Sequence, residues 1–419
     1  MRAAALVLAL IAAAAGCLGS GGRARTSGNV TFMVHASELT VWRAVVEGFA
    51  RTPGGVGVSV VEGPNATELR ENLYTTSLLA GDDAFDLVYM DVTWTSKFAA
   101  AGWLLPLDAD FPASETAKLL PAALEAGRYH GTLYRVPVRT DVGLLYYRKD
   151  LLDEAGLPPP ATFEELVRAS RALERPPQLW GFVFQGSQYE GLVCGYLEVL
   201  HGHGGFWVDP ATLEVGLDRP EAVRALEFLR ACAGEHGISP AGVIAYKEDE
   251  SRRLFQDGRA VFLRSWPFVW RLAQREDSKV RGRIGVVPMV HATGVSGGGT
   301  LGGWGFGISR SSRRPDLALK FLRYAVSLEG QRALCASTGY APALVAAYDD
   351  AELLARNPLL PELRRMHDGA VARPAIPRYA HASDILQRHV SAALAGLDQP
   401  PHALAQAAAE TRLLLGRRR

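Results

Sequence analysis

After the first thirty residues, short β-rich runs alternate with longer segments of helical period, which is the pattern of layered α/β proteins. At 419 residues with 48% hydrophobic side chains, the chain exceeds one core of usual size and holds enough apolar residues for two. Since no low-complexity linker separates two halves, we expect two lobes joined by several chain crossings. We predict strands over residues 31–34, 56–61 and 86–90, and helices over residues 39–49 and 67–79.

Local signals place several helix ends. Thr162 followed by Glu165 predicts a capping box at a helix start. Pro220 and Pro315 each precede an apolar periodic run, where the first turn of a helix has no use for an N–H. Gly234 is placed to end the helix that Pro220 begins.

The N-terminus has the features of an export signal. Arg2 is followed by an apolar run over residues 3–15, which is shorter than the roughly 20 residues that a membrane-spanning helix needs. The ending Ala-Ala-Gly-Cys at residues 14–17 resembles a bacterial lipobox, so we predict a lipoprotein signal peptide over residues 1–17 with Cys17 as lipid anchor. An ordinary secretory signal is the alternative. Residues 18–28 suit a flexible tether, and we expect a membrane-anchored protein facing the periplasm or cell exterior.

Charge and cysteine content exclude several classes of protein. Lys plus Arg (45) nearly cancels Asp plus Glu (44), so no overall field favours nucleic acid. Cys194, Cys232 and Cys335 are far apart and form no CxxC motif, which argues against a disulfide framework or a zinc site, although one disulfide pair stays open. We therefore expect no metal and no cofactor.

Three formal motif matches have a simpler interpretation. Residues 297–302 satisfy GxGxxG, but residues 304–308 then alternate like a strand, without the helix that a dinucleotide site needs. Residues 294–298 satisfy GxSxG without the strand and helix of a nucleophile elbow. His201 and His203 lack further ligands nearby, so we interpret them as a loop pair.

Acidic and aromatic residues at predicted strand ends are the informative ones. Asp91 follows an apolar strand and Asp141 precedes another, which places both at the edge where a sheet meets a cleft. Carboxylates accept hydrogen bonds from sugar hydroxyls, and the less polar faces of sugar rings stack on indoles such as Trp266, Trp270 and Trp304. The pattern indicates saccharide recognition; the alternative is that these residues cap turns and fill the core.

With these residues the chain resembles the trehalose/maltose-binding proteins of bacterial and archaeal ABC importers, within family 1 of the extracellular solute-binding proteins. The resemblance runs from about residue 30 to residue 415. Its strongest stretches are residues 89–92, 141–151, 180–194, 301–304 and 373–374.

The resemblance implies an α/β, two-lobed periplasmic-binding-protein fold of the class II type. Each lobe would have a mixed, mostly parallel sheet flanked by helices, and the lobes would close over the ligand. One lobe would take residues 29–138 plus 290–340, and the other residues 139–289 plus 341–419.

The resemblance also implies a set of ligand-binding residues. Carboxylates would accept from hydroxyls, arginines would donate in forks and tryptophans would stack. The implied residues are Glu38, Arg70, Asp91, Asp141, Trp266, Gly303, Trp304 and Arg373.

Arg139 departs from the family pattern, which has an aromatic residue, usually tyrosine, two positions before the aspartate. One interpretation is that Arg139 still bonds neutral hydroxyls or points aside. The other is that it binds an anionic group, which would make the ligand a charged glycoside such as a sugar phosphate or glucosylglycerate.

The resemblance predicts a monomeric substrate-binding subunit that captures an α-linked disaccharide, trehalose or maltose, and delivers it to the membrane subunits of an ABC importer. A glycoside hydrolase is the rival, since paired carboxylates also cleave glycosides, but hydrolysis needs one carboxyl group with a raised pKa. We expect the arginines to hold the neighbouring carboxylates ionised, which favours a binding protein. A chemoreceptor-coupled sensor would share the fold and differ only in its partner.

Overall fold

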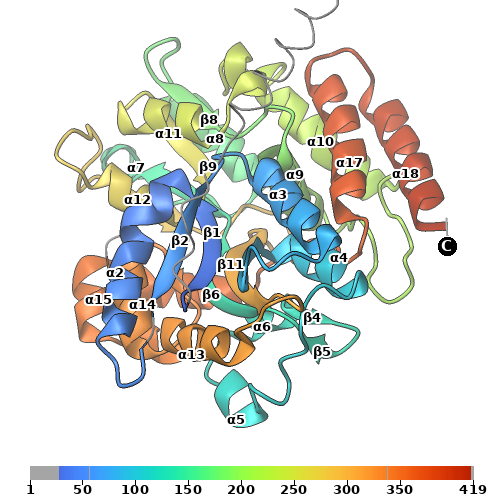
Figure 1. Ribbon diagram of the computed structural model, residues 1–419. Coiled ribbons are helices and arrows are strands. Elements are labelled where there is room, and N and C mark those ends of the chain that lie inside the picture. The colour runs from blue at the N-terminus through green and yellow to red at the C-terminus, as the bar shows by residue number, and fades with distance from the viewer. Residues whose placement is uncertain (1–27, 56, 337, 417–419) are drawn as a thin grey trace, which may run out of the picture.

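The computed structural model describes residues 28–55, 57–336 and 338–416, and Figure 1 shows two sheets with helices packed around them. The predicted signal peptide, Cys17 and most of the predicted tether lie outside the described residues. No helix in the described part of the chain is both long and apolar enough to cross a membrane.

The first sheet has the strand order β12-β6-β11-β3, and a two-stranded sheet of β1 and β2 lies next to it, with β1 against β3. A short hairpin of β4 and β5 follows the helices after β3. The strands are β1 (Val30–His35), β2 (Val58–Gly63), β3 (Leu87–Asp91), β4 (Arg128–Tyr129), β5 (Thr132–Leu133), β6 (Val136–Val142), β11 (Leu301–Ile308) and β12 (Ala341–Pro342).

The second sheet has the order β10-β7-β9-β8. Its strands are β7 (Leu144–Arg148), β8 (Trp180–Val183), β9 (Ala260–Ser265) and β10 (Ile284–Val287). The two-lobed α/β class is thereby confirmed, but the expectation of mostly parallel sheets is wrong. Among the described strands only β1 with β2 and β8 with β9 pair in parallel. In the first sheet β11 lies between β3 and β6 antiparallel to both, and in the second β7 lies between β9 and β10 antiparallel to both.

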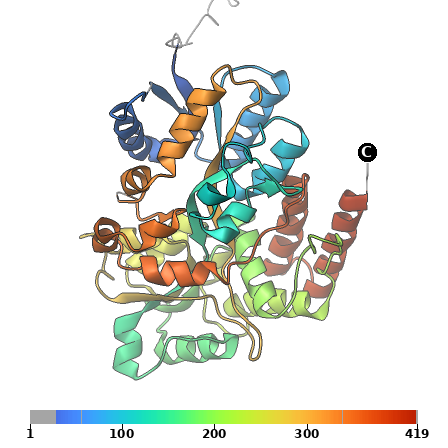
Figure 2. The same cartoon turned by 90° about the horizontal axis from the view of Figure 1, so that it is seen from below.

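Helices cover both sheets, and Figure 2 shows the last two, α17 and α18, side by side at one edge of the molecule. The helices of the first half are η1 (Ala36–Glu38), α2 (Leu39–Ala50), α3 (Thr67–Ala80), η2 (Val92–Trp94), α4 (Thr95–Ala100), α5 (Ala113–Thr116), α6 (Pro121–Glu125), α7 (Lys149–Ala155), α8 (Phe163–Leu173) and α9 (Glu190–Gly202). Those of the second half are α10 (Pro220–Ala233), η3 (Ala241–Ala245), α11 (Glu248–Gln256), α12 (Phe268–Ala273), α13 (Pro315–Ala325), α14 (Leu328–Cys335), η4 (Val345–Tyr348), α15 (Ala351–Arg356), α16 (Leu360–His367), α17 (Tyr379–Leu394) and α18 (Pro400–Gly416).

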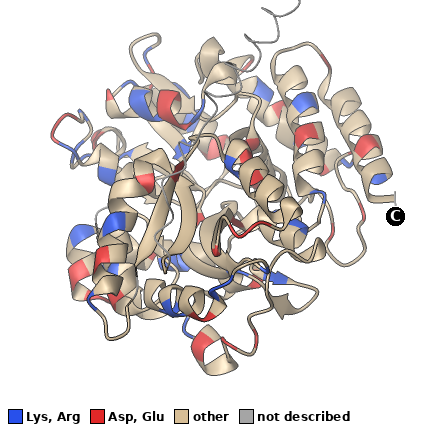
Figure 3. Ribbon diagram, in the orientation of Figure 1, with Lys and Arg blue, Asp and Glu red and all other residues tan. Residues whose placement is uncertain are grey.

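The local predictions are largely confirmed. The Thr162 side chain accepts from the Glu165 amide and the Glu165 carboxylate accepts from the Thr162 amide, which is the predicted capping box of α8. Pro220 and Pro315 begin α10 and α13, and Gly234 caps the end of α10. Basic and acidic side chains are interspersed along the helices in Figure 3, in keeping with the near-zero net charge.

The chain passes between the two sheets at three places that touch one another. β6 continues into β7 through Gly143, and residues 288–300 lead from β10 to β11. Val371, after α16, donates its N–H to the Gly299 carbonyl and accepts from the Leu301 amide. A side chain on Gly299 would lie 2.0 Å from the Gly143 carbonyl oxygen, and one on Gly298 would lie 2.1 Å from the Gly369 carbonyl oxygen. Glycine is therefore required where the three crossings meet.

Two apolar clusters lie on the faces of the sheets. Leu144 and Tyr146 of β7 belong to the first cluster and Leu145 to the second, because alternate residues of a strand face opposite sides of its sheet. The clusters thus follow sheet faces, and the lobe boundaries given above stay a prediction.

Candidate functional site

Nearly all the sequence-predicted binding residues lie in one buried group between the two sheets, here called the central cluster. Strands β3, β6 and β11 of the first sheet supply four of its residues, η1, α3 and the start of α9 supply one each, and the segments that follow β9 and α16 supply the other two. The central cluster comprises Glu38, Arg70, Asp91, Arg139, Asp141, Glu190, Trp266, Trp304 and Arg373.

Arg139 is the centre of one half of this cluster. Its Nη1 donates to Asp141 Oδ2 at 2.5 Å, and its Nη2 to Glu38 Oε1 at 3.2 Å. Its Nε donates to the Tyr89 hydroxyl at 3.1 Å. All three residues of this ion-pair group are less than a tenth exposed, so the charges are neutralised inside the protein rather than by water. Every nitrogen of the Arg139 guanidinium thus has a protein partner.

Tyr340 forms the outer wall of this half. Its hydroxyl donates to Glu38 Oε1 at 2.9 Å, and the Arg139 guanidinium carbon lies 4.1 Å from the centre of its ring. A stacked guanidinium on an aromatic face gains cation–π attraction in addition to its ion pairs. Tyr340 therefore fixes Glu38 and Arg139 together.

Arg373 holds the other half. Its Nη2 donates to Asp91 Oδ1 at 3.0 Å and its Nη1 to Glu190 Oε1 at 2.7 Å. Asp91 ends β3 of the first sheet, whereas Glu190 begins α9, which packs on the second apolar cluster. The Tyr379 hydroxyl also donates to Glu190 Oε1. Arg373 therefore bridges elements of both sheets.

Trp304 lies next to residues of both halves of the central cluster. It pairs with Asp91 in β3 and with Arg139 in β6, because β11 runs between these strands. The guanidinium carbon of Arg70 lies 4.9 Å from its ring centre and that of Arg139 5.7 Å. Arg70 is oriented by the Pro64 carbonyl, which accepts from its Nη1 at 2.8 Å.

Trp266 and the glycines of β11 complete the site. An added side chain on Gly302 would lie 3.3 Å from the Trp266 ring and 3.2 Å from the Asp141 Cβ, so the indole and the carboxylate are neighbours across this glycine. Gly303 has φ +125° and faces the Arg139 carbonyl, where a Cβ would approach to 2.6 Å. Only glycine fits this position, which lets β6 and β11 approach closely.

Three buried polar atoms of the cluster have no hydrogen-bond partner among the described residues. They are Arg70 Nε, Asp141 Oδ1 and Arg373 Nε. Each such atom costs about 1–3 kcal/mol when nothing pairs with it. One acceptor and two donors in a cluster that also holds two indoles suit a ligand rich in hydroxyl groups.

Burial raises the pKa of Asp141 to about 6, and the nearby Arg139 opposes this rise without cancelling it. The expectation that arginines keep the neighbouring carboxylates ionised is therefore wrong at Asp141 below about pH 6. For Arg139 the carboxylates and tyrosines around it raise the pKa well above its usual value, so the guanidinium stays charged.

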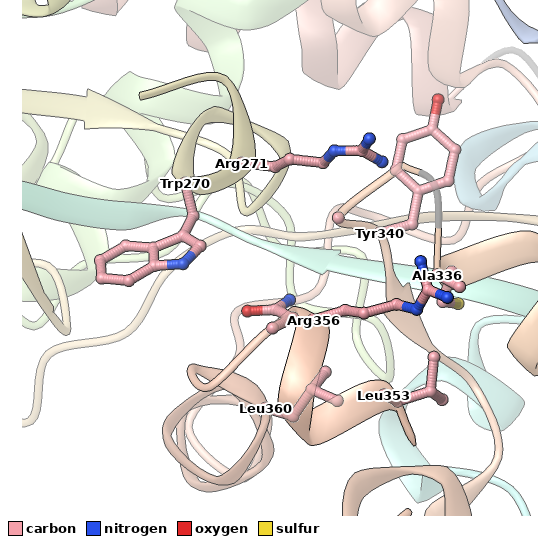
Figure 4. A pocket seen from close by; sticks show the side chains of 10 residues that line it. Trp270, Arg271, Ala336, Tyr340, Leu353, Arg356 and Leu360 are labelled. Atoms are coloured by element: carbon pink, nitrogen blue, oxygen red, sulfur yellow. The ribbon is translucent and has the colours of Figure 1, made fainter. Parts of the chain in front are cut away.

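Sequence reasoning missed several residues of this site. Tyr89 and Glu190 lie inside two of the stretches that carry the family resemblance, which is the signal that could have found them. Tyr340 stands in no such stretch. Trp270, which was a candidate for stacking, lies outside the central cluster and lines a separate pocket with Arg271 and Tyr340 (Figure 4).

The histidine pair and the cysteines singled out in the sequence lie outside the central cluster. His201 is in the last turn of α9 rather than in a loop, and His203 stacks on Phe163 with ring centres 4.3 Å apart. Among the described residues there is no group of three or more His, Cys, Asp or Glu that could hold a metal ion. Cys194, Cys232 and Cys335 are buried free thiols.

Two α/β sheets, three touching crossings and a buried polar cluster between them define a two-lobed solute-binding protein. The chain belongs to the family of bacterial extracellular solute-binding proteins, whose model matches residues 35–332.

Individual relatives extend this similarity over most of the chain. A probable ABC transporter-binding protein of Deinococcus radiodurans is 32% identical over 359 residues, 84% of each chain. The maltose-bound MalE3 of T. maritima is 35% identical with a TM-score of 0.86, covering 92% of this chain and 99% of that chain. A solute-binding protein of Thermotoga lettingae, bound to α-D-tagatose, is 26% identical with a TM-score of 0.82, covering 93% and 100%.

Proposed function

We propose that this protein is the extracytoplasmic substrate-binding subunit of an ABC sugar importer and that it captures an α-linked disaccharide, trehalose or maltose, by closure of its lobes. The observation that carries the proposal is the set of unpartnered atoms in the central cluster, which are Arg70 Nε, Asp141 Oδ1 and Arg373 Nε. A disaccharide would pair with these atoms and stack on the indole. The similarity to the maltose-bound MalE3 supports the choice of sugar.

Lobe closure would follow from where the ligand contacts lie. Ligand favours a closed state only to the extent that it touches both halves. Asp91 and Trp304 belong to the first sheet, while Trp266 follows β9 of the second. A sugar held by all three would link the sheets.

Arg139 was a candidate for binding an anionic ligand. Its three nitrogens already donate to Asp141, Glu38 and Tyr89, and two of these partners are carboxylates that would repel an anion. This geometry favours a neutral ligand, as in the other interpretation. Arg139 would not bond the hydroxyls itself, because its nitrogens are engaged, and would instead order the carboxylates that accept from them.

A glycoside hydrolase is the second class to test, because Asp141 has the raised pKa that a general acid needs. Its Oδ2 is held by Arg139 at 2.5 Å, however, which would compete with proton donation to a leaving group. The family membership and the relatives likewise favour a binding protein.

We propose further that the protein is monomeric and that it is lipid-anchored through Cys17. A chemoreceptor-coupled sensor with the same fold would differ from an importer subunit only in its partner.

Calorimetric titration with trehalose, maltose, sucrose and glucosylglycerate, with tagatose for comparison, tests the ligand. We expect micromolar binding of trehalose or maltose, about 8 kcal/mol, and recovery of the sugar intact. Absence of binding to every sugar would refute the proposal, and release of glucose would replace it with a hydrolase.

A further inference from the structure

A pocket that Tyr340 lines adjoins the central cluster and has a different chemistry. It has a volume of about 230 Å³ and lies between α12 and the helices α14 to α16 (Figure 4). Leu353 and Leu360 give it an apolar floor, and Arg271, Arg356 and Asn357 supply polar groups. Among the described residues that line it, none is acidic.

The two arginines of this pocket are weakly neutralised. Arg271 makes no ion pair or side-chain hydrogen bond with any described residue, and its stem packs on Gly339. Arg356 has only one ion pair, at 3.6 Å with Glu352 on the preceding turn of its helix, and both side chains are more than half exposed. Exposed pairs of this kind neutralise charge poorly. In Figure 4 the Arg271 guanidinium extends toward Tyr340 and the Arg356 guanidinium toward Ala336.

Asn357 adds a donor. Its Oδ1 accepts from the Leu359 amide at 3.2 Å, while its amide nitrogen makes no hydrogen bond with a described residue. The free polar groups of the pocket are therefore donors, and two of them carry positive charge. Forked guanidinium donors match the oxygens of phosphate and carboxylate groups.

Tyr340 is shared by this pocket and the central cluster. It lines the pocket, while its hydroxyl donates to Glu38 and the Arg139 guanidinium lies against its ring. In the central cluster four carboxylates outnumber three guanidiniums, so that site disfavours an anion, whereas the pocket that Tyr340 also lines favours one.

We propose that this pocket is an anion-selective subsite that binds a phosphate or carboxylate group attached to a sugar whose rings lie in the central cluster. The proposal rests on the proposed function, because the sugar part is bound there. Arg271 reaches the pocket from α12 and Arg356 from α15, and side chains of both helices belong to the first apolar cluster. An anion held by both arginines would therefore link these two helices.

The test compares neutral and anionic sugars on the whole protein by calorimetry. The probes are trehalose with trehalose 6-phosphate, maltose with maltose 1-phosphate, and glucosylglycerate for the carboxylate. We expect an anionic sugar to bind at least about tenfold more tightly than its neutral parent at low salt, because a charge-assisted pair forms. This ratio should fall as salt is added.

Variants assign the effect to the pocket. In R271A and R356A the ratio should fall toward one, while affinity for the neutral sugar is kept. R275A is the matched control, since Arg275 follows α12, pairs with Asp277 at the surface and lies outside the pocket. It should leave the ratio unchanged.

Three results would overturn the subsite. They are equal affinity of the wild type for neutral and anionic sugars, a ratio that survives in the R271A/R356A double variant, and equally strong competition by inorganic phosphate alone. Failure of every sugar to bind would instead refute the proposed function, so the two failures are distinguishable.

Discussion

Arg264 and Glu198 form a doubly bonded ion pair with almost no exposure to water. Nε of Arg264 donates to Oε2 of Glu198 at 2.7 Å and Nη2 donates to Oε1 at 2.5 Å. Oε1 also accepts from the Thr300 amide at 3.0 Å, and a side chain on Gly143 would collide with it. The pair thus supports two of the three crossings directly, and the Arg264 guanidinium also lies 4.3 Å from the ring of Trp266.

Replacing Glu198 by glutamine should destabilise the protein strongly. The variant keeps the shape but leaves Arg264 as an uncompensated buried charge, which costs about 3–5 kcal/mol. Urea denaturation measures the loss. The double variant E198Q/R264M should recover part of it, and a loss below about 1 kcal/mol in E198Q would contradict a structural role for the pair.

The crossing glycines give a second prediction about stability. G299A places a Cβ 2.0 Å from the Gly143 carbonyl oxygen and should cost about 1–3 kcal/mol, as overpacking does. Gly195 is the matched control, because it lies inside α9 with nothing within 4 Å of an added Cβ. G195A should therefore stabilise by up to about 1 kcal/mol. Equal melting temperatures for the two variants would contradict the close contact of the crossings.

Asp141 predicts a pH dependence of sugar binding. Its pKa in the free protein is raised to about 6, and a sugar hydroxyl donates best to the ionised carboxylate. Because the sugar binds the ionised carboxylate, binding lowers the pKa of Asp141. The affinity for the sugar should therefore fall as the pH drops through about 6. D141N should bind about 10- to 100-fold more weakly at pH 7.5 and lose this pH dependence. Calorimetry between pH 5 and pH 8 checks both, and a slope that persists in D141N would assign it to another group, such as His35.

Trp304 should carry much of the sugar affinity. W304F keeps a ring against Tyr89 and Trp94 but removes part of the surface over which Arg70 lies, so affinity should fall about tenfold. W103F is the control, because Trp103 packs on Phe98 away from the central cluster. Similar affinities for the two variants would exclude Trp304 from the binding surface.

Local structure was readable from the sequence because it depends on neighbours in the chain. The capping box of α8 and the proline starts of α10 and α13 involve residues at most four positions apart. The class of the fold followed in the same way from alternating periods. Strand direction did not, since β11 joins β3 and β6 from about 160 residues or more along the chain.

The structure brings together most of the residues that the resemblance implied, and their role in ligand binding stays a prediction; how they pair was not predicted. Asp91, Asp141 and Trp304 lie together as the resemblance implied. That Arg139 would be held by Glu38, and that Tyr340 would cover it, depends on contacts more than 100 residues apart in sequence. Such contacts leave no periodic signal in a single chain.

The passage of β6 into β7 limits how the two halves can move. Val142 belongs to the first sheet and Leu144 to the second, and only Gly143 lies between them, so their Cα atoms are at most about 7 Å apart in any conformation. Sliding of one sheet along the other is thereby blocked at this point, and rotation remains. A rotation displaces atoms in proportion to their distance from its axis, so a rotation at Gly143 that hardly shifts the strands beside it moves the outer helices much further.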